Sequence, residues 1–122
     1  MKLTYNEIYN IYDKYIENIY NNNEKYFPVK IYFIMNKNFK KIKELRFMID
    51  AARENLVKHY GEDQGDGSYV IPSDLLTEAQ LEMDKLSNTS TEIDIDYISI
   101  SEFEKIELTP AQYNAIEWML VI

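Results

Sequence analysis

The 122-residue sequence contains no cysteine, one histidine and only three glycines. Without cysteine the chain has no disulfide, no thiol nucleophile and no cysteine zinc site. So few glycines exclude the phosphate-holding loops of P-loop, dinucleotide-binding and kinase folds. No window approaches the roughly 18 consecutive apolar residues of a membrane span, and the opening residues lack the order of a signal peptide. These absences predict a cytosolic protein with no cofactor and no membrane contact.

Basic residues are also in deficit. Thirteen lysines and arginines face 21 acidic residues, which gives a net charge of −8 and an isoelectric point near 4.6. Nucleic-acid-binding domains normally carry a basic surface, so we expect no direct nucleic-acid binding. An acidic surface either keeps a protein in solution, the commoner case, or attracts a basic partner. With 46% hydrophobic residues, the chain fits a single compact domain over residues 1–122.

A capping box at Thr4 and Glu7 predicts a helix over residues 5–21. On a helical wheel its apolar arc covers about 180°, whereas one packing face needs little more than about 100°. The surplus lies along one border and consists of Tyr5, Tyr9 and Tyr20. Tyrosine is enriched at protein interfaces because it buries area and keeps a polar tip. The border is therefore a candidate contact surface.

The sequence ends in five consecutive apolar residues, Trp118 to Ile122. Ordinary core packing explains this run, and it equally explains the tyrosine border. Because the two features occur together, self-association or partner binding explains them about as well as core packing does. We therefore count Trp118 among the candidate contact residues and a homo-oligomer among the expected states.

The middle of the chain predicts alternating strands and helices. Residues 26–35 are rich in β-branched and aromatic side chains, which is typical of a buried strand. A long helix is then expected from Asn36 or Asn38 to Tyr60, ended by Gly61 in a left-handed conformation. A polar turn over 62–68, a short strand over 69–71 and a helix capped by Ser73 or by the box Thr77–Gln80 follow.

The last third has two more capping boxes and one alternating segment. Residues 91–97 alternate between apolar and acidic side chains, as in a half-exposed strand. Boxes at Ser101–Glu104 and Thr109–Gln112 predict a helical turn and a final helix. Together the elements predict an α+β fold: a small, at least partly antiparallel sheet of about three strands, covered by four to five helices.

Glu92, Asp94 and Asp96 project from one face of the alternating segment, about 6.5–7 Å apart. Such a row can bind a basic partner, hold a metal ion or imitate phosphate spacing. Such a row also protects an exposed strand edge from pairing with other chains, which is the commoner use of charged side chains at a sheet edge. Residues 62–73 resemble a calcium loop only in part, because Ser73 stands where a bidentate glutamate is required. We predict no metal site and no catalytic residue.

Two further features have a functional and a structural interpretation. Five cations gather at the predicted start of the long helix, where the helix dipole disfavours them: Lys37, Lys40, Lys41, Lys43 and Arg46. They indicate an anion site or an acidic partner, or a solvated face neutralised by nearby carboxylates. His59 is the single candidate for histidine acid–base catalysis, and no nucleophile motif accompanies it.

Several stretches resemble a family of small, functionally uncharacterised proteins from phages and prophages of low-GC Gram-positive bacteria. They are MKLTYNEIYNIY, NKNFKKIKEL, AARENLVKHYGEDQGDGSYVI, LSNTSTEIDI and IELTPAQYNAIEWML. The resemblance implies a phage product acting in the host cytoplasm or in the virion, and it transfers no site residue. Two non-enzymatic functions then compete. One is an inhibitor of a host defence, such as an anti-CRISPR, or of another nucleic-acid-handling protein. The other is a virion component or assembly factor acting through self-association.

Overall fold

The computed structural model describes residues 1–21 and 25–122, and within them the fold is mostly helical. The α-helices are α1 (Tyr5–Tyr15), α2 (Val29–Tyr60), α3 (Leu76–Asn88) and α4 (Pro110–Ile116), with a π-helical segment η1 (Ile16–Tyr20) and 3-10 segments η2 (Ile100–Phe103) and η3 (Glu117–Met119). The strands are β1 (Lys2–Thr4), β2 (Glu62–Asp63), β3 (Tyr69–Val70), β4 (Ser90–Glu92), β5 (Ile98–Ser99) and β6 (Leu120–Val121). The α+β class is confirmed.

The predicted sheet of about three strands is wrong. In the described residues the strands pair only two by two: β1 with β4 and β2 with β3 are antiparallel, and β5 with β6 is parallel. Each strand is two or three residues long, and one segment expected to supply a strand is helical instead. Helix packing therefore forms the core, and the short pairs fasten the connecting segments.

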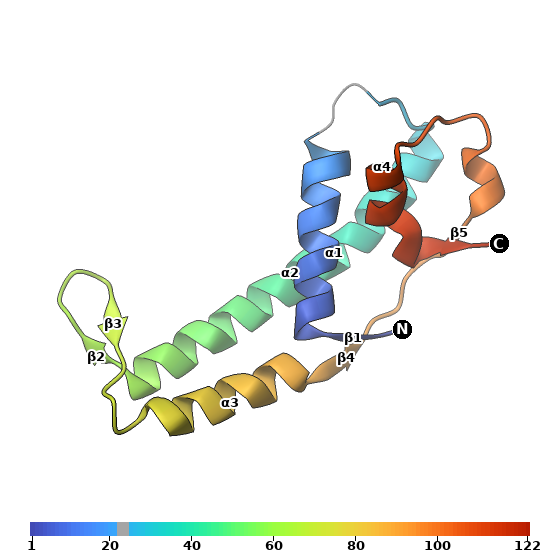
Figure 1. Cartoon of the computed structure of the whole chain (residues 1–122). Helices are drawn as coiled ribbons and strands as arrows, with labels where there is room; N and C mark the ends of the chain where they lie inside the picture. Colours follow the sequence, from blue (N-terminus) through green and yellow to red (C-terminus); the bar gives the residue numbers. More distant parts are fainter. Residues whose placement is uncertain (22–24) are drawn as a thin grey trace.

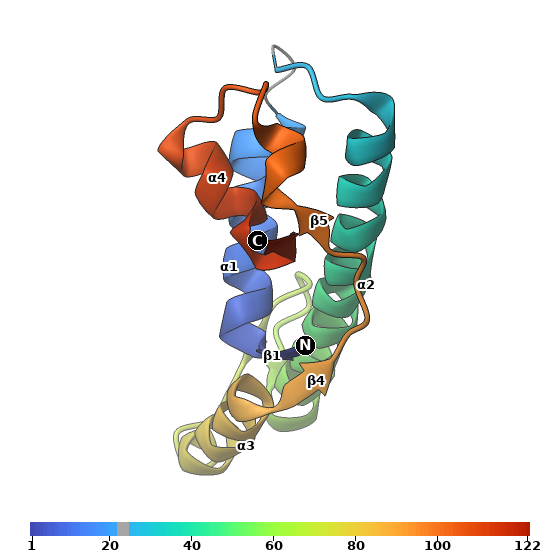
Figure 2. The same ribbon diagram turned by 90° about the vertical axis from the view of Figure 1, so that its right-hand side faces the viewer.

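The molecule consists of a body and an arm (Figure 1). In the body, α1 packs against α2, whose residues 29–46 belong to the body, and α4 packs against α1 (Figure 2). In the arm, residues 47–88, α2 continues outward, the β2–β3 hairpin turns the chain, and α3 runs back along α2. The most deeply buried large side chains all belong to the body: Tyr15, Ile8, Met35, Ile42, Ile116, Met119 and Asn38.

Two capping boxes form as predicted. The Thr4 hydroxyl accepts from the Glu7 amide, and the Glu7 carboxylate accepts from the Thr4 amide at 3.2 Å, so α1 begins where expected. Thr109 and Gln112 make the same pair of bonds, with Pro110 at the first position of α4. The helix predicted over 5–21 continues beyond α1 as η1.

Other predicted caps do not form. Ser101 lies inside η2, and Thr77 lies inside α3. The residue that precedes α3 is Leu75, which makes no side-chain cap bond, so Ser73 does not cap it either. A Ser/Thr-x-x-Glu/Gln spacing occurs easily within a helix, where residues three apart are neighbours, and it then marks no boundary.

The strand predicted over residues 26–35 is wrong, because α2 already begins at Val29, after Pro28. The buried residues of its first half are Ile31, Met35, Asn38, Phe39 and Ile42, at spacings of three, four and one. This periodicity starts inside the segment that composition assigned to a strand. Packing of one apolar face against α1 outweighs the modest strand preference of isoleucine, phenylalanine and tyrosine.

A single helix of 32 residues results, about 48 Å long. Asn36 and Asn38 lie within it and cap nothing. The basic cluster from Lys37 to Arg46 therefore lies in the middle of α2, and the predicted conflict with the helix dipole does not arise.

The end of α2 also differs from the prediction. Gly61 has φ −90° and ψ 156°, which is extended and not left-handed. There is no room for a side chain on its Cα: an added Cβ would lie 2.6 Å from the Val57 carbonyl oxygen and 2.9 Å from the Tyr69 Cβ. Glycine is required here because the hairpin approaches the helix end closely. The left-handed glycines are Gly65 and Gly67, in the turn of the hairpin.

Candidate interaction surfaces

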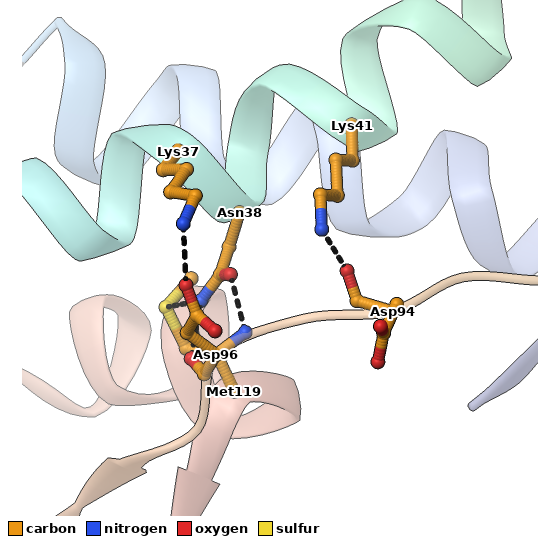
Figure 3. A network of polar contacts seen from close by, with 6 residues as sticks. All are labelled: Lys37, Asn38, Lys41, Asp94, Asp96 and Met119. Carbon is orange, nitrogen blue, oxygen red and sulfur yellow. Dashed lines mark hydrogen bonds and ion pairs between the residues drawn. The ribbon is translucent and has the colours of Figure 1, made fainter.

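The acidic segment and the basic cluster face each other within the chain (Figure 3). Lys37 Nζ lies 2.9 Å from Asp96 Oδ2, and Lys41 Nζ donates to the Asp94 carbonyl oxygen. The hydrogen bond from Lys37 and then its charge hold the pKa of Asp96 below its usual range. Both partners remain about half exposed, so this is a surface pair of modest strength. Asp96 and Lys37, which sequence analysis offered as contacts for a partner, thus bind each other within the chain.

The buried side chain of Asn38 also binds this segment, at the backbone of Asp96. Its side-chain nitrogen donates to the Asp96 carbonyl oxygen at 2.7 Å, and its side-chain oxygen accepts from the Asp96 amide at 2.9 Å. The nitrogen also contacts the Met119 sulfur at 3.7 Å. The buried amide therefore pairs with the extended segment as a neighbouring strand would, and Figure 3 shows both bonds. Sequence analysis missed this role because it placed Asn38 at a helix boundary.

The three carboxylates of the predicted acidic face differ in their surroundings. Glu92 lies in β4, 3.3 Å from the amino group of Met1, whose strand pairs with β4. Asp96 pairs with Lys37, and Asp94 contributes its backbone carbonyl to a bond with Lys41. All three side chains are exposed. Their predicted role in partner binding stays a prediction.

The predicted tyrosine border is divided. Tyr5 and Tyr9 stack at 4.6 Å and lie against α2, where the Arg46 guanidinium is 4.3 Å from the centre of the Tyr9 ring. Arg46 also covers Tyr12 and forms an ion pair with Asp13. Tyr5 and Tyr9 are consequently half-buried parts of the α1–α2 contact. Tyr20 alone is well exposed, at 58%, near the other end of the body.

Most of the apolar run from Trp118 to Ile122 packs into the body. Trp118 is half buried and donates its indole N–H to the Ala115 carbonyl oxygen at 3.0 Å. Met119 is fully buried, and Leu120 pairs with Ile98 in the β5–β6 ladder. Only the last two residues project, so the run contributes mainly to the core and little to a contact surface.

Two exposed apolar areas on α2 were not predicted. We call the first the aromatic end: Tyr26, Val29 and Phe33, which are 75%, 81% and 68% exposed. The second is the Phe47 groove, a surface hollow of about 660 Å³ lined by Tyr12, Lys40, Lys43, Glu44, Arg46, Phe47, Met48 and Asp50. A helical wheel of residues 29–60 places Phe33 and Phe47 opposite the buried face, so correct helix bounds would have revealed both.

The calcium-like turn and His59 both lie on the arm. In the described part of the chain no three histidine, aspartate or glutamate side chains come together as metal ligands. In the calcium-like turn, Asp63 accepts from the Gly65 amide and Asp66 from the Ser68 amide and hydroxyl. These bonds lower the pKa of Asp66 and serve the turn itself. His59 lies edge-on to Tyr60, on the arm.

Comparison of the chain with protein-family models, with curated proteins and with solved structures finds no match. Across residues 1–21 and 25–122, none of the helices has both the length and the apolar character required to cross a membrane.

Proposed function

We propose that the protein acts by binding another protein and catalyses no reaction. The observation that carries this proposal is the aromatic end, where Val29 and Phe33 stand one turn apart on the solvent side of α2, just after Tyr26. Full burial of one such side chain is worth about 1.5–3 kcal/mol relative to exposure. Adjacent exposed apolar residues of this size mark interaction sites more often than isolated ones do.

The charge distribution supports a basic partner. Residues 62–107 contain thirteen acidic residues and two basic ones, so the hairpin, α3 and the segment after them form a strongly acidic region. Such a region speeds the approach of a basic surface and selects against acidic ones. Proteins that handle nucleic acid expose basic surfaces. The specific role we propose is therefore inhibition of a host nucleic-acid-handling protein, of the anti-CRISPR kind, by a phage-encoded protein in the host cytoplasm.

The second candidate is a virion component or assembly factor that associates with copies of itself. The observation in its favour is the Phe47 groove, which lies on the same helix as the aromatic end, with Phe47 about four turns beyond Phe33. The two candidates use different surfaces, and variants can separate them.

The test places a photo-crosslinking amino acid at Phe33 in cells where the protein is made by its phage. The matched control carries it at Asn55, an exposed polar residue of the same helix. We expect one discrete heavier adduct from position 33 and none from position 55. The captured protein is then purified, and its affinity is measured by calorimetry.

In that measurement Phe33→Ser should weaken binding at least about tenfold, as central aromatic contacts do. Phe47→Ser, which removes an equally exposed phenylalanine from α2, should bind like the unmodified protein. Equal binding by Phe33→Ser, or no adduct at position 33, would rule out the aromatic end as the docking surface.

A further inference from the structure

The Phe47 groove has a pronounced charge pattern along one stripe of α2. Phe47 is 76% exposed, and the neighbouring Met48 65%. Lys43 and Lys40 precede Phe47 by four and seven residues, and Asp50 follows it by three. Neither lysine makes an ion pair in the described residues, whereas Asp50 lies 3.9 Å from Arg46. This stripe of the groove, which Glu44 and Arg46 also line, favours an occupant with an apolar centre, negative charge toward Lys40 and Lys43, and a positive charge toward Asp50.

The outward face of α3, with the turn before it, has that pattern. The buried residue of the helix is Ala79, and Leu81, two residues further and so on the opposite side, is 56% exposed. Glu78 precedes Leu81 by three residues on α3, and Asp74 lies in the turn just before the helix begins. Lys85 follows Leu81 by four residues and forms an ion pair with Glu82 at 2.9 Å. When α3 lies parallel to α2 with Leu81 on Phe47, Glu78 lies opposite Lys43 and Lys85 lies opposite Asp50, because these spacings differ by one residue.

We propose that the Phe47 groove receives α3 of a second copy of this chain. The pairs are Leu81 with Phe47, Glu78 with Lys43 and Lys85 with Asp50, and Asp74, in the turn before α3, lies near Lys40 at the edge of the contact. This inference concerns a surface other than the aromatic end and stands independently of partner binding there.

The position of α3 within each chain decides whether the proposed contact forms a closed dimer or a longer assembly. Within one chain, Leu86 of α3 lines a common hollow with Ala52 and Leu56 of α2. These residues lie about half a turn around α2 from Phe47 and Asp50. Each chain therefore presents its groove and its outward α3 face in opposite directions. The contact is heterologous, and repeated contacts build rings or open chains rather than a two-fold dimer.

The contact is small. A helix of 13 residues covers less than the about 800 Å² per partner of a standard interface. We expect a dissociation constant in the micromolar range or weaker, and an average mass that rises with concentration over about 10 μM to 1 mM.

Sedimentation velocity over that range provides the first measurement. Phe47→Ser and Leu81→Ser should each remain monomeric at every concentration. Phe33→Ser and Leu76→Ser alter equally exposed apolar residues outside the contact and should assemble like the unmodified protein. Far-ultraviolet circular dichroism confirms that each variant is folded. A monomeric unmodified protein at 1 mM, or undiminished assembly of Phe47→Ser, would overturn the proposal.

A charge exchange tests the register. Lys40→Glu with Lys43→Glu makes the groove acidic, and Asp74→Lys with Glu78→Lys makes the α3 face basic. Each double variant alone presents like charges at the contact and should stay monomeric, while an equimolar mixture should assemble, because every groove then finds a complementary helix. A mixture that stays monomeric rejects the pairing.

The direction of assembly is tested by adding Leu81→Ser in small amounts to the unmodified protein. This variant keeps its groove but lacks the α3 anchor, so it ends a growing chain. The mean mass should fall well below that of a sample in which the unmodified protein replaces the variant at equal total concentration. An unchanged mean mass would contradict head-to-tail linkage.

Discussion

Asn38 and Asp96, 58 residues apart, are joined by two hydrogen bonds between one side-chain amide and one residue's backbone. The donor and the acceptor of the Asp96 backbone are both satisfied, although no strand lies beside it. Asn38 itself is completely buried, at 0% exposure. A helix thereby holds an extended segment without a sheet.

Replacing Asn38 with leucine should lower the free energy of unfolding by about 2–4 kcal/mol. The change leaves the amide and carbonyl of Asp96 without partners, and unsatisfied buried groups cost more than the bonds themselves contribute. Urea denaturation measures the difference. Asn55→Leu, at an exposed site on the same helix, should change stability by less than about 0.5 kcal/mol. A cost below about 1 kcal/mol for Asn38→Leu would show that water replaces the amide.

Tyr9→Phe should leave stability unchanged or raise it by up to about 1 kcal/mol. The Tyr9 hydroxyl is buried and finds no hydrogen-bond partner among the described residues, so its removal relieves a desolvation cost. Tyr9→Ser should instead destabilise the protein by about 1–3 kcal/mol, because the ring packs under Arg46 and on Tyr5. Thermal unfolding of both variants distinguishes the hydroxyl from the ring. A neutral Tyr9→Ser would restore the exposed border that sequence analysis predicted.

Burial of Tyr15 makes the free energy of unfolding depend on pH in the alkaline range. Its hydroxyl donates to Asn36 at 2.8 Å, and burial raises its pKa above the ordinary value of 10.0. A raised pKa in the folded state contributes stability below about pH 10, which is lost as the pH rises further. Near pH 7 the unmodified protein should be about 1 kcal/mol more stable than Tyr15→Phe. Urea unfolding should show this gap narrowing above pH 10; a constant gap would contradict burial of the phenol.

The Asp96–Lys37 pair should make the free energy of unfolding depend on pH in the acidic range. Because the pKa of Asp96 is lowered in the folded state, its contribution is present above the unfolded pKa of about 3.9 and is lost as the pH falls further. Asp96→Asn should therefore be less stable than the unmodified protein at pH 6, with the difference shrinking toward pH 3. Glu104→Gln, an exposed carboxylate, is the control. A difference that is independent of pH would show that the pair contributes nothing.

Features determined by three or four neighbouring residues were predictable. The capping boxes at Thr4 and Thr109 depend only on local bonds, and both form. The alternation over residues 91–97 correctly indicated that Ile95 is buried and Asp94 and Asp96 exposed. The strand predicted there ends at Glu92, however, and Tyr97, on the same alternating side as Ile95, is 51% exposed. It did not indicate what covers the segment, since alternation reports which side faces the core and not whether a strand or a helix lies beside it.

Features that depend on distant residues were not predictable. Residues 29–35 became helical because Ile31 and Met35 join the buried cluster that side chains of α1 and α4 also form, and composition alone does not contain those contacts. Sequence analysis marked Lys37 and Asp96 separately as charged features. That they pair across 59 residues follows from the packing of residues 93–97 along α2. For the same reason the exposed aromatic end was hidden inside a predicted buried strand.

The undivided course of α2 from body to arm has a consequence for local motion. Its buried side chains stop at Ile42, and beyond residue 46 the helix is covered on one side only, by α3 and part of α1. Amide hydrogens of residues 31–42 should exchange with solvent only through global unfolding, whereas those of residues 50–60 should exchange through openings of lower free energy. One continuous helix thus contains two cooperative units, and the outer one can open while the inner one remains folded.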